Sequence, residues 1–282
     1  MLPMRLNHLI IGIKGAGDLA SAVAWRLYMA NMRRIFMMEI PYPMAVRRGV
    51  SFCEAIHEQS KTLEGIEAVR TDDAEAVRRS WEKGRIAVLV DPEWLNQKIL
   101  QPDVLVDAIV AKKNLGTAKS EAGAVIGLGP GFAAGTDVHM VIETNRGHNL
   151  GRVITSGAAE ANTGVPGAIG GYTAERVLRA PVKGLFRARL EMGDTVRCGE
   201  VVGDVAGIEV KAGINGVVRG LIRSHIEVAE GLKIGDIDPR GDKSYCYTIS
   251  DKARAIAGAV LEAVLRIYNG GHRNIPETYG DI

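Results

Sequence analysis

A glycine turn between an apolar strand and an apolar helix places the strongest constraint on the fold of this chain. Residues 9–13 (LIIGI) have the pattern of a buried strand, residues 14–20 (KGAGDLA) form the turn, and residues 21–29 continue as an apolar helix. In such a GxGxxA turn, the first glycine allows a tight bend and the second lets a phosphate approach. The small third residue lets the helix pack closely on the strand. The pattern predicts a Rossmann-like unit with Gly15 and Gly17 beside a cofactor phosphate.

Two acidic residues near this turn bear on the identity of the ligand. Glu39 ends the next predicted strand, residues 34–38, where dinucleotide-binding folds place a carboxylate that binds ribose. Asp18 directly follows Gly17, where a carboxylate would repel a pyrophosphate but would suit a helix N-terminus. NAD(P) is therefore one candidate cofactor, and the same turn can also serve packing alone.

Apolar strands alternate with helical segments through the first half of the chain. Further strands are expected at residues 65–70, 86–90, 104–110 and 124–128, with helices at residues 51–58 and 71–84. This alternation predicts an α/β domain over residues 1–155 with a mostly parallel sheet, whose ligand crevice lies at the carboxyl ends of the strands. Asp107 is unusual, because a carboxylate inside an apolar strand requires a partner or marks a site.

Residues 127–151 (GLGPGFAAGTDVHMVIETNRGHNLG) form the second glycine-rich stretch. Gly129 and Gly131 are candidates for contact with a phosphate, although the stretch is not a P-loop because GxxxxGK[ST] is missing. Polar residues follow, and His139 and Glu143 are expected to converge with Asp137 and with residues 144–146 and 148 at the floor of an inter-domain cleft. Candidate catalytic residues are His139, Glu143 and His148, and Arg146 is a candidate anion contact. No metal site is assigned, and the catalytic residues remain unknown.

The second half of the chain is richer in glycine and contains an internal repeat. Residues 156–179 are expected to form a glycine-rich connection, residues 180–245 a β domain, and residues 246–282 a C-terminal helix and tail. The repeated pattern in the β domain resembles the barrel-sandwich of biotinyl and lipoyl carrier domains. The carriers' MKM-type motif is missing around Lys211, so we expect the scaffold without the carrier function.

Composition excludes several classes of protein. With a net charge of +2 and 5% aromatic residues, the chain offers little for nucleic acid to bind. Its three cysteines lie far apart, which argues against a disulfide framework and a structural zinc site. No run of about eighteen apolar residues occurs, so no membrane span is expected. We expect a cytoplasmic protein and a homo-oligomer. The apolar stripe of the last helix is expected to pack on a domain or on a partner subunit.

Several segments together resemble one family. The segments IKGAGDLAS, VRRGVSF, VLVDAIVAKKN and GLGPGFAAGTDVHMVIETNRGHNLGRVI, with the β domain, are similar to the YqeB family of accessory proteins of selenium-dependent molybdenum hydroxylases. The N-terminal turn also resembles the XdhC-type accessory proteins. The resemblance implies maturation of a molybdenum hydroxylase client through the molybdenum cofactor, and it assigns no catalytic residue. An NAD-dependent oxidoreductase and a non-catalytic scaffold that docks a client enzyme remain alternatives.

Overall fold

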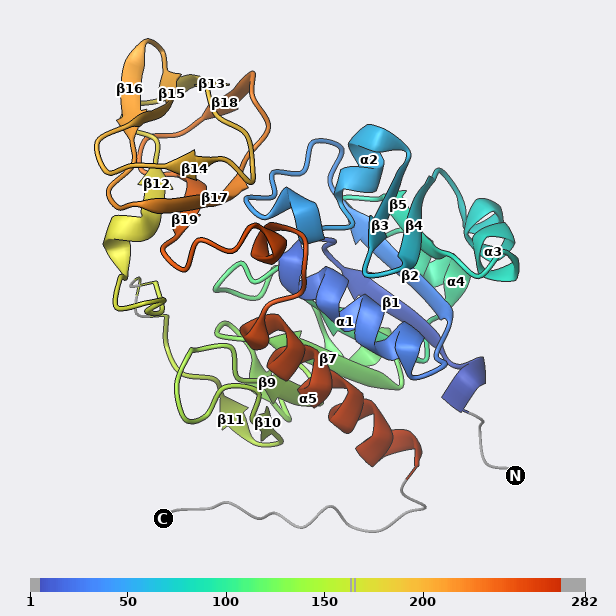
Figure 1. The fold of residues 1–282 in the computed structure, drawn as a ribbon. Helices are drawn as coiled ribbons and strands as arrows, with labels where there is room; N and C mark the ends of the chain where they lie inside the picture. The colour runs from blue at the N-terminus through green and yellow to red at the C-terminus, as the bar shows by residue number, and fades with distance from the viewer. Residues whose placement is uncertain (1–5, 163, 165, 270–282) are drawn as a thin grey trace.

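The computed structural model describes residues 6–162, 164 and 166–269. A large, mostly parallel sheet organises the first half of the chain (Figure 1). Its strands are β1 (Ile10–Lys14), β2 (Arg34–Glu39), β3 (Ser60–Leu63), β4 (Ile66–Thr71), β5 (Ile86–Val90), β6 (Val104–Asp107), β7 (Ala124–Leu128), β9 (Met140–Ile142) and β10 (Val153–Ile154). They lie in the order β10-β9-β7-β6-β1-β2-β5-β4-β3, with the edge strands β10 and β3 antiparallel to their neighbours and the others parallel. The predicted mixed α/β fold with a mostly parallel sheet is confirmed.

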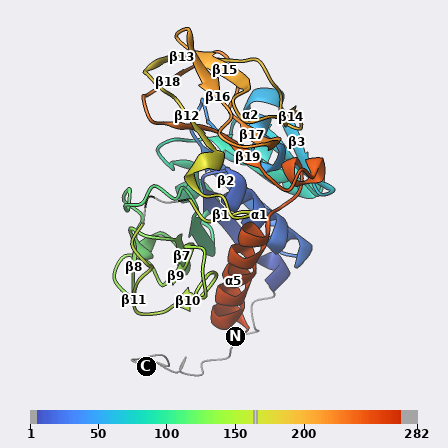
Figure 2. The ribbon, with the colours of Figure 1, turned by 60° about the vertical axis from the view of Figure 1, so that its left-hand side comes forward.

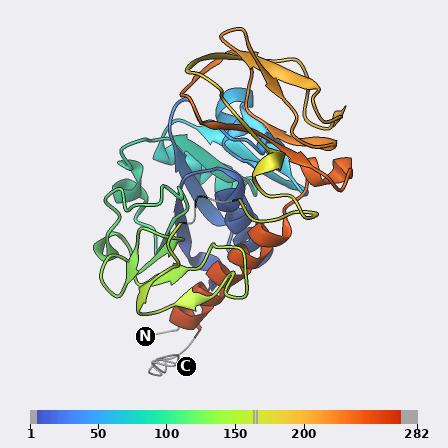
Figure 3. The same cartoon turned by 90° about the vertical axis from the view of Figure 1, so that its left-hand side faces the viewer.

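Helices cover both faces of this sheet. The helices are α1 (Asp18–Met29), α2 (Glu54–Glu58), α3 (Ala74–Glu82), α4 (Asn96–Leu100) and α5 (Asp251–Tyr268). One apolar core joins α1, α2 and α5 to the sheet, and a second core joins α3 and α4 to its other face. Helix α5 lies beside α1 although it comes from the far end of the chain (Figures 1 and 3). Its predicted apolar stripe is therefore covered within the same chain. None of the helices in the described part of the chain is long and apolar enough to cross a membrane.

The strand order reverses direction between β1 and β6. From β1 the chain adds β2 on one side, and it later returns to add β6 on the other side. In open parallel sheets, ligands bind outside the carboxyl ends of the strands at such a switch point. The turn that begins at Gly15 and the segment after Asp107 meet there, since Gly15 approaches the backbone of Ala108.

Two antiparallel sheets make up most of residues 177–238. Their strands are β12 (Val177–Arg179), β13 (Gly184–Ala188), β14 (Thr195–Val196), β15 (Val201–Val205), β16 (Ile208–Lys211), β17 (Gly216–Leu221), β18 (Ile226–Val228) and β19 (Lys233–Asp238). The sheet orders are β12-β19-β17-β14 and β16-β15-β13-β18. This arrangement follows the internal repeat. The two central strands of one sheet, β13 and β15, come from the first half of the repeat, and the two central strands of the other, β17 and β19, come from the second half. The two sheets share one apolar core.

Arginine side chains join the antiparallel sheets to the α/β part. The Arg47 guanidinium donates to Asp18 Oδ2 at 3.0 Å and to the carbonyls of Tyr245 and Thr248, both at 2.9 Å. Arg48 Nε donates to the Leu221 carbonyl at the end of β17, at 2.7 Å. These contacts fix the position of the sheets near the N-terminal ends of α1 and α5 (Figure 2).

Candidate functional site

A cleft of about 380 Å³ lies between the antiparallel sheets, the start of α1 and the start of α5. Its volume is in the range of about 300–1,000 Å³ that is typical of small-molecule sites. It is lined by residues that are far apart in the sequence, from Asp18 near the first glycine turn to Lys252 at the start of α5. An inter-domain position of this kind is common for ligand sites. We therefore treat this cleft as the candidate site.

The lining of the cleft carries a large excess of positive charge. Seven cationic side chains line it against two acidic ones, Asp18 and Glu160. The cationic residues are Arg47, Lys112, Arg146, Arg176, Arg219, Lys233 and Lys252. The whole chain has a net charge of only +2, so positive charge is concentrated here. A cleft with walls of one sign attracts ligands of the opposite sign, which in this case are anions.

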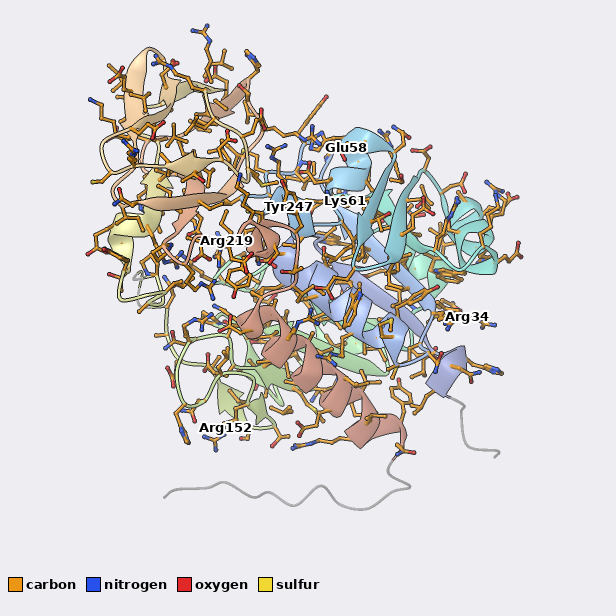
Figure 4. The ribbon with its side chains drawn as sticks, viewed as in Figure 1. Arg34, Glu58, Lys61, Arg152, Arg219 and Tyr247 are labelled. Atoms are coloured by element: carbon orange, nitrogen blue, oxygen red, sulfur yellow. The ribbon has the colours of Figure 1, made fainter. Side chains whose placement is uncertain are left out.

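A buried ionic network supports the wall formed by the β17–β19 sheet. Asp236 is completely buried and accepts hydrogen bonds from Arg176, from Arg219 Nη2 at 2.6 Å and from Lys233 Nζ at 3.3 Å. Burial alone would raise the pKa of Asp236, but Lys233, Arg219 and Arg176 together hold it below its ordinary value. Arg219 lies between the antiparallel sheet and the start of α1 in Figure 4. The carboxylate thus orients cationic side chains that face the cleft.

Lys252 differs from the cationic residues around it. Its ammonium has no ion pair with any residue that the structure describes, and the side chain is half-buried in the first turn of α5. Burial, followed by the nearby Arg146 guanidinium, lowers the pKa of Lys252, while Asp18 and Glu143 act in the opposite direction. A cation near a helix N-terminus is also unfavourable with respect to the helix dipole. Lys252 is therefore a positive group that lacks a full counter-charge.

The predicted residues of the first glycine turn are largely engaged with one another. The Gly15 N–H donates to the Met38 carbonyl at 2.8 Å, and the Ala16 N–H donates to Glu39 Oε2 at 2.9 Å. Burial raises the pKa of Glu39, although the N–H groups of Ile40 and Ala16 partly oppose this. Glu39 thus binds the backbone of the turn itself. Gly17 differs from its neighbours in having open space, because a Cβ placed on it would meet no atom within 4 Å.

Asp18 lines the cleft, but its carboxylate is tied to Arg47. The pair joins Arg47 Nη1 to Asp18 Oδ2 at 3.0 Å, with the Arg47 side chain almost fully buried. A negative group thus stands in the first turn of α1, where a phosphate would otherwise find the positive end of the helix dipole. This position weakens the expectation that the glycine turn binds pyrophosphate.

Gly129 and Gly131 are needed for contact with other parts of the chain. A Cβ at Gly131 would lie 2.6 Å from the Cα of Lys113, and one at Gly129 would lie 2.4 Å from Thr144 Oγ1. Both glycines also have a left-handed backbone, with φ of +111° and +75°. The close approach that their sequence pattern predicts is therefore made to protein atoms, although the intervening Pro130 does line the cleft.

The candidate catalytic residues do not converge. His139 and Glu143 flank the two ends of β9, so they lie about 13 Å apart along an extended strand. His139 Nδ1 accepts the Val125 N–H at 2.9 Å, while burial and then Lys119 lower the pKa of this histidine. Glu143 is buried and accepts the N–H groups of Asn145 and Glu160 at 2.6 and 2.7 Å. The expectation of convergence was wrong because residues four apart on a strand share a face but are far apart.

Arg146 and His148 follow Glu143 and have different surroundings. Arg146 lines the cleft and forms a bidentate pair with Asp251 at the start of α5, with distances of 2.7 and 2.9 Å. His148 is exposed and lies in a separate shallow depression with residues 149–152. Of the polar residues predicted to gather in this stretch, Thr144, Asn145 and Arg146 line the cleft, whereas the three candidate catalytic residues do not.

The segment after β6 brings a strained backbone to the cleft. Val110 and Lys112 both line the cleft and have φ values of +58° and +63°. A left-handed conformation is rare for a β-branched residue such as valine, and strain of this kind costs about 1–3 kcal/mol and tends to cluster at ligand sites. Lys112 is exposed, so its charge is accessible from the cleft.

Asp107 has a partner, as its position in an apolar strand requires. It accepts the Thr117 hydroxyl at 2.7 Å, and the same hydroxyl oxygen accepts from Lys14 Nζ at 2.9 Å. Lys14 also pairs with Glu121 at 2.9 Å. Burial raises the pKa of Asp107, and the Thr117 hydrogen bond opposes this. The cluster is a hydrogen-bonded polar network at the carboxyl ends of the central strands β1 and β6, and it lies outside the lining of the cleft. No group of three or more His, Cys, Asp or Glu side chains in the described residues could hold a metal ion.

Comparison with known proteins shows sequence similarity to a curated relative. Over 266 residues it is 48% identical to the "Uncharacterized protein YqeB" of Escherichia coli (strain K12), in a match that covers 94% of this chain and 49% of that protein. The chain is therefore similar to YqeB over nearly all of its own length, and it spans about half the length of the curated relative it matches. No protein-family model matches the chain.

Similarity to solved structures is weak. The chain aligns with a succinylglutamatedesuccinylase/aspartoacylase from Rhodobacter sphaeroides at 23% identity and a TM-score of 0.20, over 31% of this chain and 30% of that one. It aligns with an aspartoacylase family protein from Mesorhizobium loti at 13% identity and a TM-score of 0.27, over 81% and 84% of the two chains. TM-scores this low carry no argument about fold or function.

Proposed function

We propose that this chain is an accessory factor for the maturation of a selenium-dependent molybdenum hydroxylase. In this proposal the chain binds a phosphate-bearing cofactor, either nucleotide-bearing or a pterin, in the cleft between a Rossmann-like domain and a barrel-sandwich domain. The observation that carries the proposal is the excess of seven cationic over two acidic side chains around a cleft of about 380 Å³. The choice of client rests on the resemblance of the sequence segments described above to the accessory proteins of these enzymes.

The molybdenum cofactor fits the character of the lining. Its pterin carries a phosphate, for which Lys112, Lys233 and Lys252 offer positive charge, and the apolar side chains of Val110 and Ile169 offer contact for a ring system. When bound, the cofactor would supply the metal chemistry of the client enzyme. The chain itself would hold the cofactor and shield it from solvent.

A ligand screen by thermal shift tests the proposal. Purified protein is heated with NAD, NADP, cytidine nucleotides and molybdopterin, and a ligand at a hundred times its Kd adds about 2.7 kcal/mol of stability. We expect stabilisation by at least one phosphate-bearing ligand, and co-purification with a molybdenum hydroxylase from the native host. Absence of a shift with every ligand would refute cofactor binding and leave the scaffold alternative.

An NAD-dependent oxidoreductase is the second candidate, and one observation favours it. Gly17 leaves open space at the second position of the glycine turn, which is where a dinucleotide phosphate approaches. This candidate predicts NAD binding that weakens in Glu39→Gln. Stabilisation by a pterin or a cytidine nucleotide but not by NAD would exclude it.

A further inference from the structure

We propose that Lys252 and Lys233 anchor the phosphate or diphosphate end of the ligand on the wall of the cleft formed by α5 and β19. The proposal rests on the function proposed above, because it assigns one end of the ligand to one wall of the same cleft. Both lysines line the cleft, and they come from the start of α5 and the start of β19. No short motif in the sequence connects them.

The position of Lys252 is unfavourable unless an anion binds there. Its ammonium has no ion pair in the described part of the chain, is half-buried, and lies in the first turn of an eighteen-residue helix. Burial and the nearby Arg146 and Lys233 disfavour its charge, and Asp18 and Glu143 favour it without forming an ion pair with it. A phosphate beside Lys252 would supply the missing counter-charge and would form hydrogen bonds to a charged donor, which are stronger than neutral ones.

Lys233 adds a second cation whose orientation is fixed. Its Nζ lies 3.3 Å from Asp236 Oδ1, and Arg176 and Arg219 bind the same buried carboxylate. Arg176 and Arg219 are each more than nine-tenths buried, and the Nε atom of each has no hydrogen-bond partner among the described residues. Three cations thus share Asp236, and among the described residues Asp238, the second carboxylate partner of Arg219, also pairs with Arg240. This wall retains positive charge toward the cleft.

The first glycine turn is the competing location for the phosphate. The N–H groups of Gly15 and Ala16 already donate to the Met38 carbonyl and to Glu39. The carboxylate of Asp18 stands at the start of α1 and would repel an anion placed there. The phosphate would therefore lie on the lysine wall, and the glycine turn would face an uncharged part of the ligand.

Titration calorimetry of the full chain with inorganic pyrophosphate at low salt tests this assignment. We expect Lys252→Gln to weaken binding by about tenfold or more, the loss that one hydrogen bond to a charged group predicts. Lys252→Arg should retain most of the affinity because it keeps the charge. Lys83→Gln, which makes the same charge change at an exposed residue directly after α3, should bind like the wild type. Gly17→Val should also retain its affinity, since a Cβ at this position would meet no atom within 4 Å.

The melting temperature of the ligand-free protein separates a binding lysine from a structural one. Lys252→Gln removes an uncompensated charge, so we expect the ligand-free variant to melt at or above the wild-type temperature while losing affinity. Unchanged affinity in Lys252→Gln with loss of binding in Gly17→Val would overturn this assignment and leave the cofactor proposal standing. A wild-type protein that binds neither pyrophosphate nor any ligand of the screen would overturn both.

Discussion

Replacing Asp236 by asparagine tests whether the buried ionic network holds the cleft wall together. Asp236 is completely buried and compensates Arg176, Arg219 and Lys233 at once. Removing one partner from a buried charge pair costs about 3–5 kcal/mol. Asparagine keeps one oxygen acceptor and Asp238 remains near Arg219, so we expect a loss near the lower end, about 3 kcal/mol. For a chain of this size, that loss corresponds to a melting temperature lower by about 6 °C.

The internal repeat supplies a matched control at Asp204. This carboxylate occupies in β15 the place that Asp236 occupies in β19, and it is also buried. It accepts a hydrogen bond from the Gly207 N–H at 3.1 Å and has no ion pair within the described residues. Asparagine also keeps an oxygen acceptor here, so Asp204→Asn should cost at most about 1 kcal/mol, the value of one hydrogen bond. The same substitution at equivalent places thus isolates the contribution of the cations.

Denaturation combined with hydrogen exchange measures this difference. Protection of backbone amides in β17 and β19 should fall in Asp236→Asn and remain in Asp204→Asn. Because the cations hold the pKa of Asp236 below its ordinary value, its contribution is present above the unfolded pKa of about 4 and is lost as the pH falls through the folded pKa. The difference in the free energy of unfolding between the wild type and Asp236→Asn should therefore become smaller in acid. Equal losses of stability in Asp236→Asn and Asp204→Asn at neutral pH would refute the role of the cations around Asp236.

Two further substitutions test local features near the cleft. Gly131→Ala should destabilise the protein by about 1–3 kcal/mol, because φ is +111° and the new Cβ would lie 2.6 Å from Lys113 Cα. Gly147→Ala is the control, since a Cβ there would meet no atom within 4 Å, and similar melting temperatures for the two variants would contradict the packing role of Gly131. Asp251→Asn should cost at most about 1 kcal/mol at pH 7, since the pair with Arg146 is largely exposed. Arg146 holds the pKa of Asp251 well below its ordinary value, so this cost should begin to shrink as the pH falls below the unfolded pKa of about 4 and should disappear only as the pH falls through the lowered folded pKa. A cost that does not change between pH 7 and strong acid would contradict the pairing.

Much of the α/β part could be predicted from the sequence because its strands are continuous apolar runs. The strands at residues 86–90 and 124–128 match β5 and β7 at both ends, and the helix expected within residues 246–282 is α5. Strand β3 and helix α4 were missed, since the sequences SKTL and NQKIL are short and have no clear periodicity. The predicted strand over residues 104–110 ends early at Asp107, where the chain turns into the strained segment beside the cleft.

The candidate site was harder to predict because its residues meet only in the folded chain. A glycine pattern indicates that something approaches closely, but it does not say whether that is a ligand or the backbone of Lys113. Arg176, Arg219, Lys233 and Lys252 were all missed, since they belong to different elements and form no local motif. One signal was available: Lys252 lies in the first helical turn, two residues after the Ser250 cap, where a cation is disfavoured without an anion nearby.

The arginines and lysines of the cleft divide the structural and binding roles between them. Arg47 is buried and donates to Asp18 and to the carbonyls of Tyr245 and Thr248, so its guanidinium is occupied in joining the two parts of the chain. Planar guanidinium groups suit such fixed, multiple hydrogen bonds, whereas a lysine ammonium acts as a mobile point charge. Lys112 and Lys252 form no ion pair with other described residues and can therefore respond to a ligand. Salt should consequently weaken anion binding steeply, because exposed charges are screened, while the buried arginine contacts keep the cleft itself intact.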